Sequence, residues 1–231
     1  MTKARESPVR YRHGVDLGDV SWPEVDATRV VVVPIGSCEQ HGPHLPLATD
    51  SIIAEALARD LGARRSDCVV APTVSITASG EHQGFAGTLS IGNDAMYSVV
   101  VELVRSADWS HGVVLVNGHG GNAAAVGRAV AHLESEARRV LAWWPRVDGG
   151  DPHAGHTETS LMLAVRPDLV RLERAVPGPI PSTSDLVRSG VYALSTSGVL
   201  GDPRAASAEH GTELFRRLAD DLAHAVDAWL A

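Results

Sequence analysis

The chain has 231 residues, of which 44% are hydrophobic and 21% are charged, a balance typical of one compact globular domain. Its net charge of −8 argues against a nucleic-acid-binding protein, and no apolar stretch approaches the roughly 18 residues that a membrane span needs. The basic N-terminal segment is not followed by the apolar stretch of a secretory signal, and two cysteines cannot build a disulfide framework. We therefore expect a cytoplasmic protein without nucleic-acid or membrane partners.

Strands and helices alternate along the chain. Residues 1–29 resemble an irregular lead-in, and residues 30–37, VVVVPIGS, form an apolar run typical of a strand buried on both faces. Further strands are predicted at 68–76, 112–117 and 140–145, and helices at 50–62, 93–109, 123–139, 158–170 and 206–231. We expect Gly62 to end the first helix, and the Pro/Gly/Ser-rich stretch 174–211 to be irregular. The order predicts a single α/β domain, residues 1–231, with a largely parallel central sheet covered by helices on both faces.

Acidic and histidine side chains follow each predicted strand. The carboxyl ends of parallel strands lie at one edge of a sheet, so these side chains are expected to converge there. Carboxylates and imidazoles together are a ligand set for Zn(II), Mn(II) or Fe(II). In chain order the four clusters are Glu39, His41, His44 and Asp50; then Glu81 and His82; then His119; then Asp151, His153, His156 and Glu158.

The first cluster has a spacing suited to a metal site. In an extended segment the side chains of Glu39 and His41 share one side, and Asp50 follows nine residues after His41. Two prolines in between stiffen the loop. The alternative is a polar loop in which Asp50 merely caps the next helix.

The third cluster, NGHGGN at 117–122, has three glycines around one histidine. It is either a strand-to-helix turn with a functional His119 or a dinucleotide-binding loop that uses Gly118, Gly120 and Ala123. Against the second interpretation, the loop follows the third strand and not the first, and no acidic residue ends the next strand.

The remaining clusters allow structural interpretations as well. Glu158 in the first turn of a helix would favour the positive end of the helix dipole, and Glu81–His82 could be an ordinary loop pair. Cys38 could act as a nucleophile beside His41, but this would not explain the surplus of carboxylates. Ser160 lacks the sequence context of a serine hydrolase nucleophile.

Four segments together resemble the creatininase family of metal-dependent amidohydrolases. They are GSCEQHGPHLPLATD at 36–50, SGEHQGFAGTLSIG at 79–92, VNGHGGN at 116–122 and HAGHTETSLML at 153–163. With GVLGDPRAASAEHG at 198–211, the last one looks like the mycofactocin-associated branch of the family, whose members cleave a ribosomally made precursor peptide. The resemblance implies a creatininase-like three-layer sandwich and a homo-oligomer, often a hexamer.

The resemblance also implies two divalent metal ions per subunit, with Fe(II), Zn(II) and Mn(II) as candidates. By position, Glu39 and His119 resemble ligands of one ion, His41 a ligand of the other, and Asp50 the bridging carboxylate. Creatininase itself takes a further glutamate ligand where this chain has Gly121. We expect Glu158 to occupy that coordination position.

For the reaction, the resemblance implies attack by a metal-bound hydroxide on an amide carbonyl. His153 matches the family's active-site histidine and is the expected proton donor to the leaving amine, with His156 and Glu81 as second choices. The implied substrate is the precursor peptide, from which a modified C-terminal Val-Tyr portion is released. The alternatives are a cyclic-amide or formamide hydrolase, a dinucleotide-dependent oxidoreductase, and a non-catalytic metal-binding protein.

Overall fold

A computed structural model describes residues 15–231, apart from the side chains of Thr183 and Val187. Its five strands form one parallel sheet in the order β1-β3-β2-β4-β5. The strands are β1 (Val15–Asp16), β2 (Val30–Ile35), β3 (Cys68–Val70), β4 (Gly112–Asn117) and β5 (Val140–Trp143). The predicted α/β class with a parallel central sheet is confirmed.

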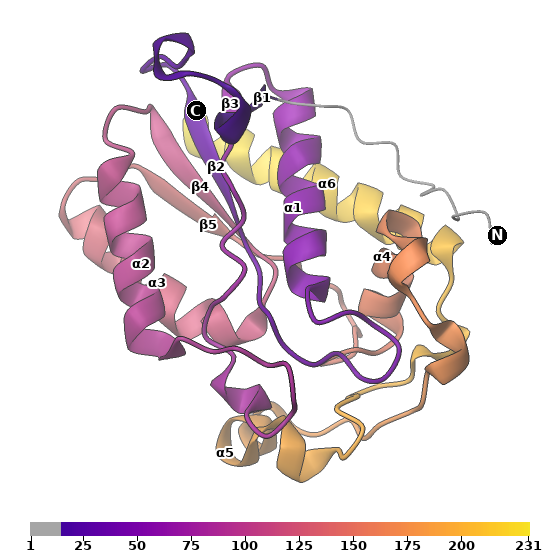
Figure 1. Ribbon diagram of the computed structural model, residues 1–231. Coiled ribbons are helices and arrows are strands. Elements are labelled where there is room, and N and C mark those ends of the chain that lie inside the picture. The colour runs from indigo at the N-terminus through magenta and orange to yellow at the C-terminus, as the bar shows by residue number, and fades with distance from the viewer. Residues whose placement is uncertain (1–14) are drawn as a thin grey trace.

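Helices cover both faces of the sheet and make three layers (Figure 1). One face carries α1 (Thr49–Arg64), α4 (His156–Val165) and α6 (Ala208–Leu230), and the other carries α2 (Gly92–Ser106) and α3 (Ala123–Ser135). A further helix, α5 (Thr183–Leu194), lies beyond the carboxyl ends of the strands. In the described part of the chain, no helix combines the length and the apolar character that crossing a membrane requires.

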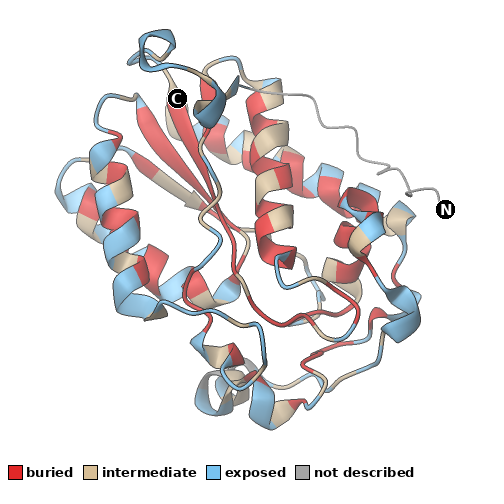
Figure 2. Ribbon diagram, in the orientation of Figure 1, coloured by how far each residue is buried: buried red, intermediate tan, exposed pale blue. Residues whose placement is uncertain are grey.

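Strand β2 shows why its sequence is apolar at successive positions. Val30 and Val32 pack into the core beneath α1, α4 and α6, whereas Val31 and Val33 pack into the core beneath α2 and α3. Successive side chains of a strand point to opposite faces, so burial on both faces demands an uninterrupted apolar run. Figure 2 shows this burial continuing from the strand into the loop that follows it.

Several element boundaries differ from the predicted ones. Helix α1 continues through the buried Gly62 to Arg64, since one helical glycine costs only about 1 kcal/mol and packing offsets it. Strand β3 stops at Val70, and the following segment adds only the isolated bridge between Ile35 and Val74. Pro72, which has no backbone N–H to donate, accounts for the early end.

Two stretches expected to be irregular contain regular structure. In the stretch 174–211 the Ser182 side chain accepts the Asp185 N–H and caps α5, which has a strongly amphipathic sequence. In the lead-in, residues 1–14 lie outside the described part of the chain, and Val15 and Asp16 pair with β3 as the short edge strand β1. Both predictions of irregular structure are wrong at these residues.

Helix α6 crosses α4 at Gly211, where an added Cβ would lie 1.8 Å from the Ser160 carbonyl oxygen. We expect Gly211→Ala to force the helices apart and lower the free energy of unfolding by about 1–3 kcal/mol, measured by urea denaturation. Gly127→Ala is the matched control, because Gly127 lies on the exposed side of α3 with open space at its Cβ position. The Gly127→Ala change should raise the free energy of unfolding by about 0.5–1 kcal/mol. Equal effects of the two changes would contradict this packing.

Candidate metal centre

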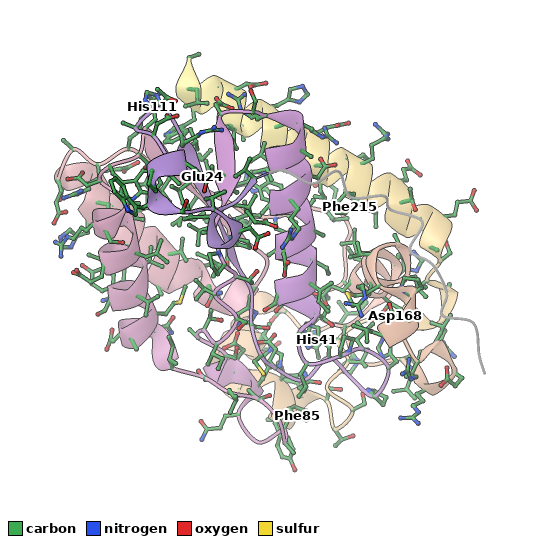
Figure 3. The ribbon with its side chains drawn as sticks, turned by 45° about the horizontal axis from the view of Figure 1, so that its top comes forward. Glu24, His41, Phe85, His111, Asp168 and Phe215 are labelled. Atoms are coloured by element: carbon green, nitrogen blue, oxygen red, sulfur yellow. The ribbon has the colours of Figure 1, made fainter. Side chains whose placement is uncertain are left out.

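The predicted site residues come together at the carboxyl end of the sheet. Glu39 and His41 lie in the loop after β2, Asp50 in the first turn of α1, and His119 directly after β4. Glu81 and His82 belong to a 3-10 turn, Gly80–His82, and His153 and Glu158 flank the start of α4. Figure 3 shows His41 near the N-terminal end of α1. His156 lies apart, because its Nε2 contacts His210 Nδ1 of α6 at 2.7 Å.

The start of α4 is held by Asp151. Its Oδ2 accepts the N–H of His156 at 2.9 Å and the N–H of Asp202 at 3.1 Å, so the helix is tied to the 198–211 segment. Within this turn, Ala154 has a positive φ of 52°, and its N–H donates to Glu158 Oε2 at 2.6 Å. The backbone therefore aims the Glu158 carboxylate into the cluster.

One group of side chains centres on Glu39, Asp50 and His119. His119 Nδ1 lies 3.1 Å from Asp50 Oδ2, and His119 Nε2 lies 3.1 Å from Glu39 Oε2. The Ser37 hydroxyl donates to Asp50 Oδ2 at 2.7 Å and fixes that carboxylate. Candidate ligand atoms of the three residues lie within 4.8 Å of one another, as the donors of one metal ion would.

A second group contains His41, Asp50 and Glu158. His41 Nδ1 lies 3.1 Å from the Glu39 carbonyl oxygen, which can only accept, so this nitrogen carries a proton. The other ring nitrogen, Nε2, lies 3.1 Å from Asp50 Oδ1 and 3.9 Å from Glu158 Oε2. A nitrogen that faces two carboxylates needs a positive charge, supplied either by a second proton or by a cation.

The Glu39 carboxylate offers the clearest test of whether the residues fit a metal. Both of its oxygens are buried, and neither makes a hydrogen bond within the described part of the chain. Leaving a buried carboxylate without hydrogen bonds is costly, so such a group needs a cation or a proton. Together with the imidazoles around it, this donor set fits a divalent metal ion.

The protonation of the carboxylates reflects this crowding. Burial and the Asp50 charge raise the pKa of Glu39 to about 8, and burial raises the pKa of Glu158 to about 7. Burial would also raise the pKa of Asp50, but the two charged imidazoles of His41 and His119 hold it well below its usual range. Asp50 is therefore the ionised carboxylate at the centre of the cluster.

The imidazoles fall into two classes. Burial opposes a charge on every ring, but neighbouring carboxylates, Asp50 first among them, raise the pKa of His41 to about 10 and that of His119 well above its usual value. Burial lowers the pKa of His82 to about 4 and that of His153 well below its usual value. Without metal, two histidines are thus charged at neutral pH and two are neutral.

The glycine at position 121 has a steric explanation. A Cβ on Gly121 would lie 2.0 Å from Glu81 Oε1 and 2.4 Å from His119 Nε2. No larger residue fits unless Glu81, His119 and the Ala78 carbonyl, 2.7 Å from that Cβ, all move. The departure from creatininase at this position therefore goes together with a glutamate that reaches the same space from another loop.

Sequence reasoning underestimated two residues of the cluster. His82 Nε2 lies 3.2 Å from Glu39 Oε1, and the buried Gln40 side chain contacts both His82 and His153. The only sequence signal for Gln40 was its position between two predicted ligands. Cys38 lies at the edge, partly exposed, with its Sγ 3.7 Å from the Gly87 carbonyl oxygen.

The 117–122 loop does not favour a dinucleotide site. His119 lies inside the acidic cluster, and a Cβ on Gly118 would lie 2.7 Å from the Asp50 carbonyl oxygen. This glycine thus allows the loop to pack against α1, which explains its presence without a bound pyrophosphate.

A parallel α/β sheet with an acid–histidine cluster beyond its carboxyl edge is an arrangement typical of metal-dependent hydrolases. The creatininase family, described as creatinine amidohydrolase, matches residues 18–226, and the chain belongs to this family. A solved creatininase variant described as Zn-Zn type has a TM-score of 0.79 and 25% identity, covering 93% of this chain and 98% of the other. The five-stranded sandwich is thus a creatininase fold and the chain a family hydrolase.

Two relatives share much more of the sequence. A mycofactocin precursor peptide peptidase from Mycobacterium tuberculosis (strain CDC 1551 / Oshkosh) is 45% identical over 231 residues, covering 93% of this chain and 92% of the relative. A protein of the same name from Mycolicibacterium smegmatis (strain ATCC 700084 / mc(2)155) is 46% identical over 211 residues, covering 87% of this chain and 85% of the relative.

The pKa values predict that metal binding releases protons. At pH 7, His41 holds a proton on Nε2 because its pKa is raised to about 10, and Glu39, at about 8, is largely protonated. A metal ion must displace these protons, so its affinity should rise between about pH 6 and pH 10. Titration calorimetry of the metal-free protein with Zn(II), in buffers of different ionisation enthalpy, measures the release. An enthalpy independent of the buffer would contradict the assignment.

Proposed function

We propose that this protein is a metal-dependent peptidase that releases the modified C-terminal Val-Tyr portion of the mycofactocin precursor peptide. The observation that carries the proposal is the identity of 45–46% with two peptidases of that name, across most of both chains. The family match at residues 18–226 includes the segments that supply the cluster, and the cluster has a composition suited to metal-dependent amide hydrolysis.

Two metal ions fit the cluster best. Glu39, Asp50 and His119 would hold one, and His41, Asp50 and Glu158 the other, with the two Asp50 oxygens divided between them. Fe(II), Zn(II) and Mn(II) all suit these ligands. Such ions, when bound, provide a nucleophile at neutral pH and polarise the amide carbonyl.

The chain's own residues handle the proton. His153 is buried and neutral, and its Nδ1 lies 3.9 Å from Glu39 Oε1, at the edge of the ligand cluster. A neutral imidazole can donate only after it has accepted a proton, so His153 would take one from the attacking water and then pass it to the leaving amine. Glu81, whose Oε1 lies 3.3 Å from His119 Nε2, orients that ring in this proposal and moves no proton.

A cavity gives the substrate access to one side of the cluster. It has a volume of about 250 Å³, and its lining includes Asp50, Gly118, Gly120, Asp151 and Glu158. A larger groove of about 590 Å³ lies elsewhere, between β5 and α6, and includes Trp143, Trp144 and Asp221. The smaller cavity supports an approach of the scissile amide from the side of Glu158.

The direct test is cleavage of the precursor peptide that carries the modified Val-Tyr portion. We expect the purified protein loaded with Fe(II), Zn(II) or Mn(II) to release the C-terminal fragment, detected by mass spectrometry, and a chelator to abolish the release. An unmodified peptide of the same sequence is the control for substrate recognition. If folded, metal-loaded protein cleaves neither peptide, but hydrolyses creatinine or a formamidopyrimidine, the cyclic-amide or formamide alternative replaces the peptidase.

The roles of His153 and Glu158 can be separated by a pair of variants. His153→Ala should keep its metal and lose about 10²- to 10⁴-fold in kcat, as expected when a proton-transfer group is removed. Glu158→Gln should lower the metal content, because it removes a charged ligand from the His41 group. Elemental analysis beside kinetics distinguishes the two. Metal loss in His153→Ala would instead make His153 a ligand, and full metal content with full activity in Glu158→Gln would eliminate Glu158.

A further inference from the structure

The side chain of Gln40 lies at the centre of a buried hydrogen-bond network. It is 6% exposed, and its amide nitrogen lies 2.9 Å from His82 Nδ1, 3.0 Å from His153 Nε2 and 3.1 Å from the Gly198 carbonyl oxygen. Its amide oxygen accepts the Gly42 N–H at 2.9 Å. One amide thus connects three segments of the chain beside the candidate metal centre.

Two backbone groups determine the orientation of this amide. The Gly42 N–H can only donate, so it must face the amide oxygen, and the Gly198 carbonyl can only accept, so it must face the amide nitrogen. The flipped amide would place two donors together and two acceptors together. The imidazoles near the amide nitrogen therefore face an NH₂ group.

The tautomer of His82 follows from this orientation. Facing an NH₂ donor, Nδ1 of His82 must accept and carries no proton. The neutral ring then has its proton on Nε2, which lies 3.2 Å from Glu39 Oε1. The Nε2–H edge of His82 faces this carboxylate at contact distance without forming a hydrogen bond, and it offers no lone pair there for a metal ion, although the distance alone is compatible with a ligand.

His153 has the same tautomer with the opposite consequence. Its Nε2 lies 2.8 Å from the Gln40 backbone carbonyl oxygen, which can only accept, so Nε2 carries the proton. The two amide hydrogens of Gln40 go to Gly198 and His82, and none is left for the 3.0 Å contact with His153. In the neutral form of the ring the lone pair is therefore on Nδ1, which lies on the Glu39 side.

We propose that Gln40 is a positioning residue, which with its side chain and its backbone carbonyl turns opposite ring edges of the two histidines toward Glu39. His82 turns its N–H toward the carboxylate, and His153 turns Nδ1, the nitrogen at which this ring can accept a proton. The tautomers stand independently of the proposed function, whereas the use of the His153 nitrogen in hydrolysis rests on it.

The close fit of the surrounding loop supports a built network. Gly198 has a φ of +80°, and a Cβ there would lie 1.7 Å from Gln40 Oε1. Only glycine allows the 198–211 segment to bring its carbonyl group up to the amide. This accounts for Gly198, the first glycine of the GVLGDP sequence, which the metal centre itself does not explain.

The tautomers can be measured on the metal-free wild-type protein. Long-range ¹H–¹⁵N NMR at about pH 8 should show His82 and His153 as neutral rings, both protonated on Nε2, with His82 Nδ1 in the range of a hydrogen-bonded acceptor. His82 protonated on Nδ1, or His153 with Nδ1 protonated, would overturn the assignment. Because no metal or substrate is present, this outcome does not depend on the peptidase proposal.

Gln40→Met tests the role of the side chain, since it keeps the length and removes both donors. We expect the ¹⁵N resonance of His82 Nδ1 to shift toward that of a nitrogen without a hydrogen bond. The His153 resonances should not shift, because the backbone carbonyl of residue 40 remains. The kcat of the metal-loaded enzyme should fall about 10- to 100-fold. Gln83→Met is the control, because it makes the same chemical change at an exposed glutamine outside the network. Unchanged His82 resonances in Gln40→Met would refute the proposal.

Discussion

The site depends on one buried carboxylate, Asp50, held between two imidazoles. Its oxygens lie 3.1 Å from His41 Nε2 and 3.1 Å from His119 Nδ1, and Ser37 donates a further hydrogen bond. Asp50 lies in the first turn of α1, where the helix dipole favours a negative charge. A carboxylate in the interior is stable only when its surroundings supply positive charge, so the loops after β2 and β4 must both bring a histidine to the same helix end.

This arrangement explains why so many titratable groups share a small volume without unfolding the chain. In the metal-free protein, protons on His41 and Glu39 stand where metal ions would supply the charge. Because these two pKa values are raised in the folded state, they contribute stability that is fully present at pH values below the ordinary pKa values of the two groups. This stability is lost as the pH rises through about 8 for Glu39 and about 10 for His41. A metal ion bound at these residues would replace that contribution and would couple the folded state of the loops to its binding.

Much of this could be predicted from the sequence, because local pattern and topology determine it. The apolar run of β2 indicated burial on both faces, and parallel strands bring their carboxyl ends to one edge, so Glu39, His41 and His119 had to lie near one another. The roles of Glu81 and Gly121 were not predictable from the sequence. They depend on two loops that meet in space, where the Glu81 carboxylate lies at the position that a Cβ of residue 121 would occupy. Helix α5 was missed because its stretch is rich in residues typical of loops, and packing against the Gly80–His82 turn outweighs that preference.

Gln40 shows where sequence reasoning ends and geometry becomes necessary. The sequence EQH at 39–41 indicated two candidate ligands, and nothing in the pattern indicated a function for the glutamine between them. Its function depends on Gly42, two residues away, and on Gly198, 158 residues away, which together allow a single orientation of the amide. That orientation distinguishes a histidine that turns an N–H toward Glu39 from one that turns toward it the nitrogen able to accept a proton. Two rings that both face Glu39 Oε1, at 3.2 Å and 3.9 Å, therefore turn different edges toward it, and distance alone is insufficient to assign ligands in this cluster.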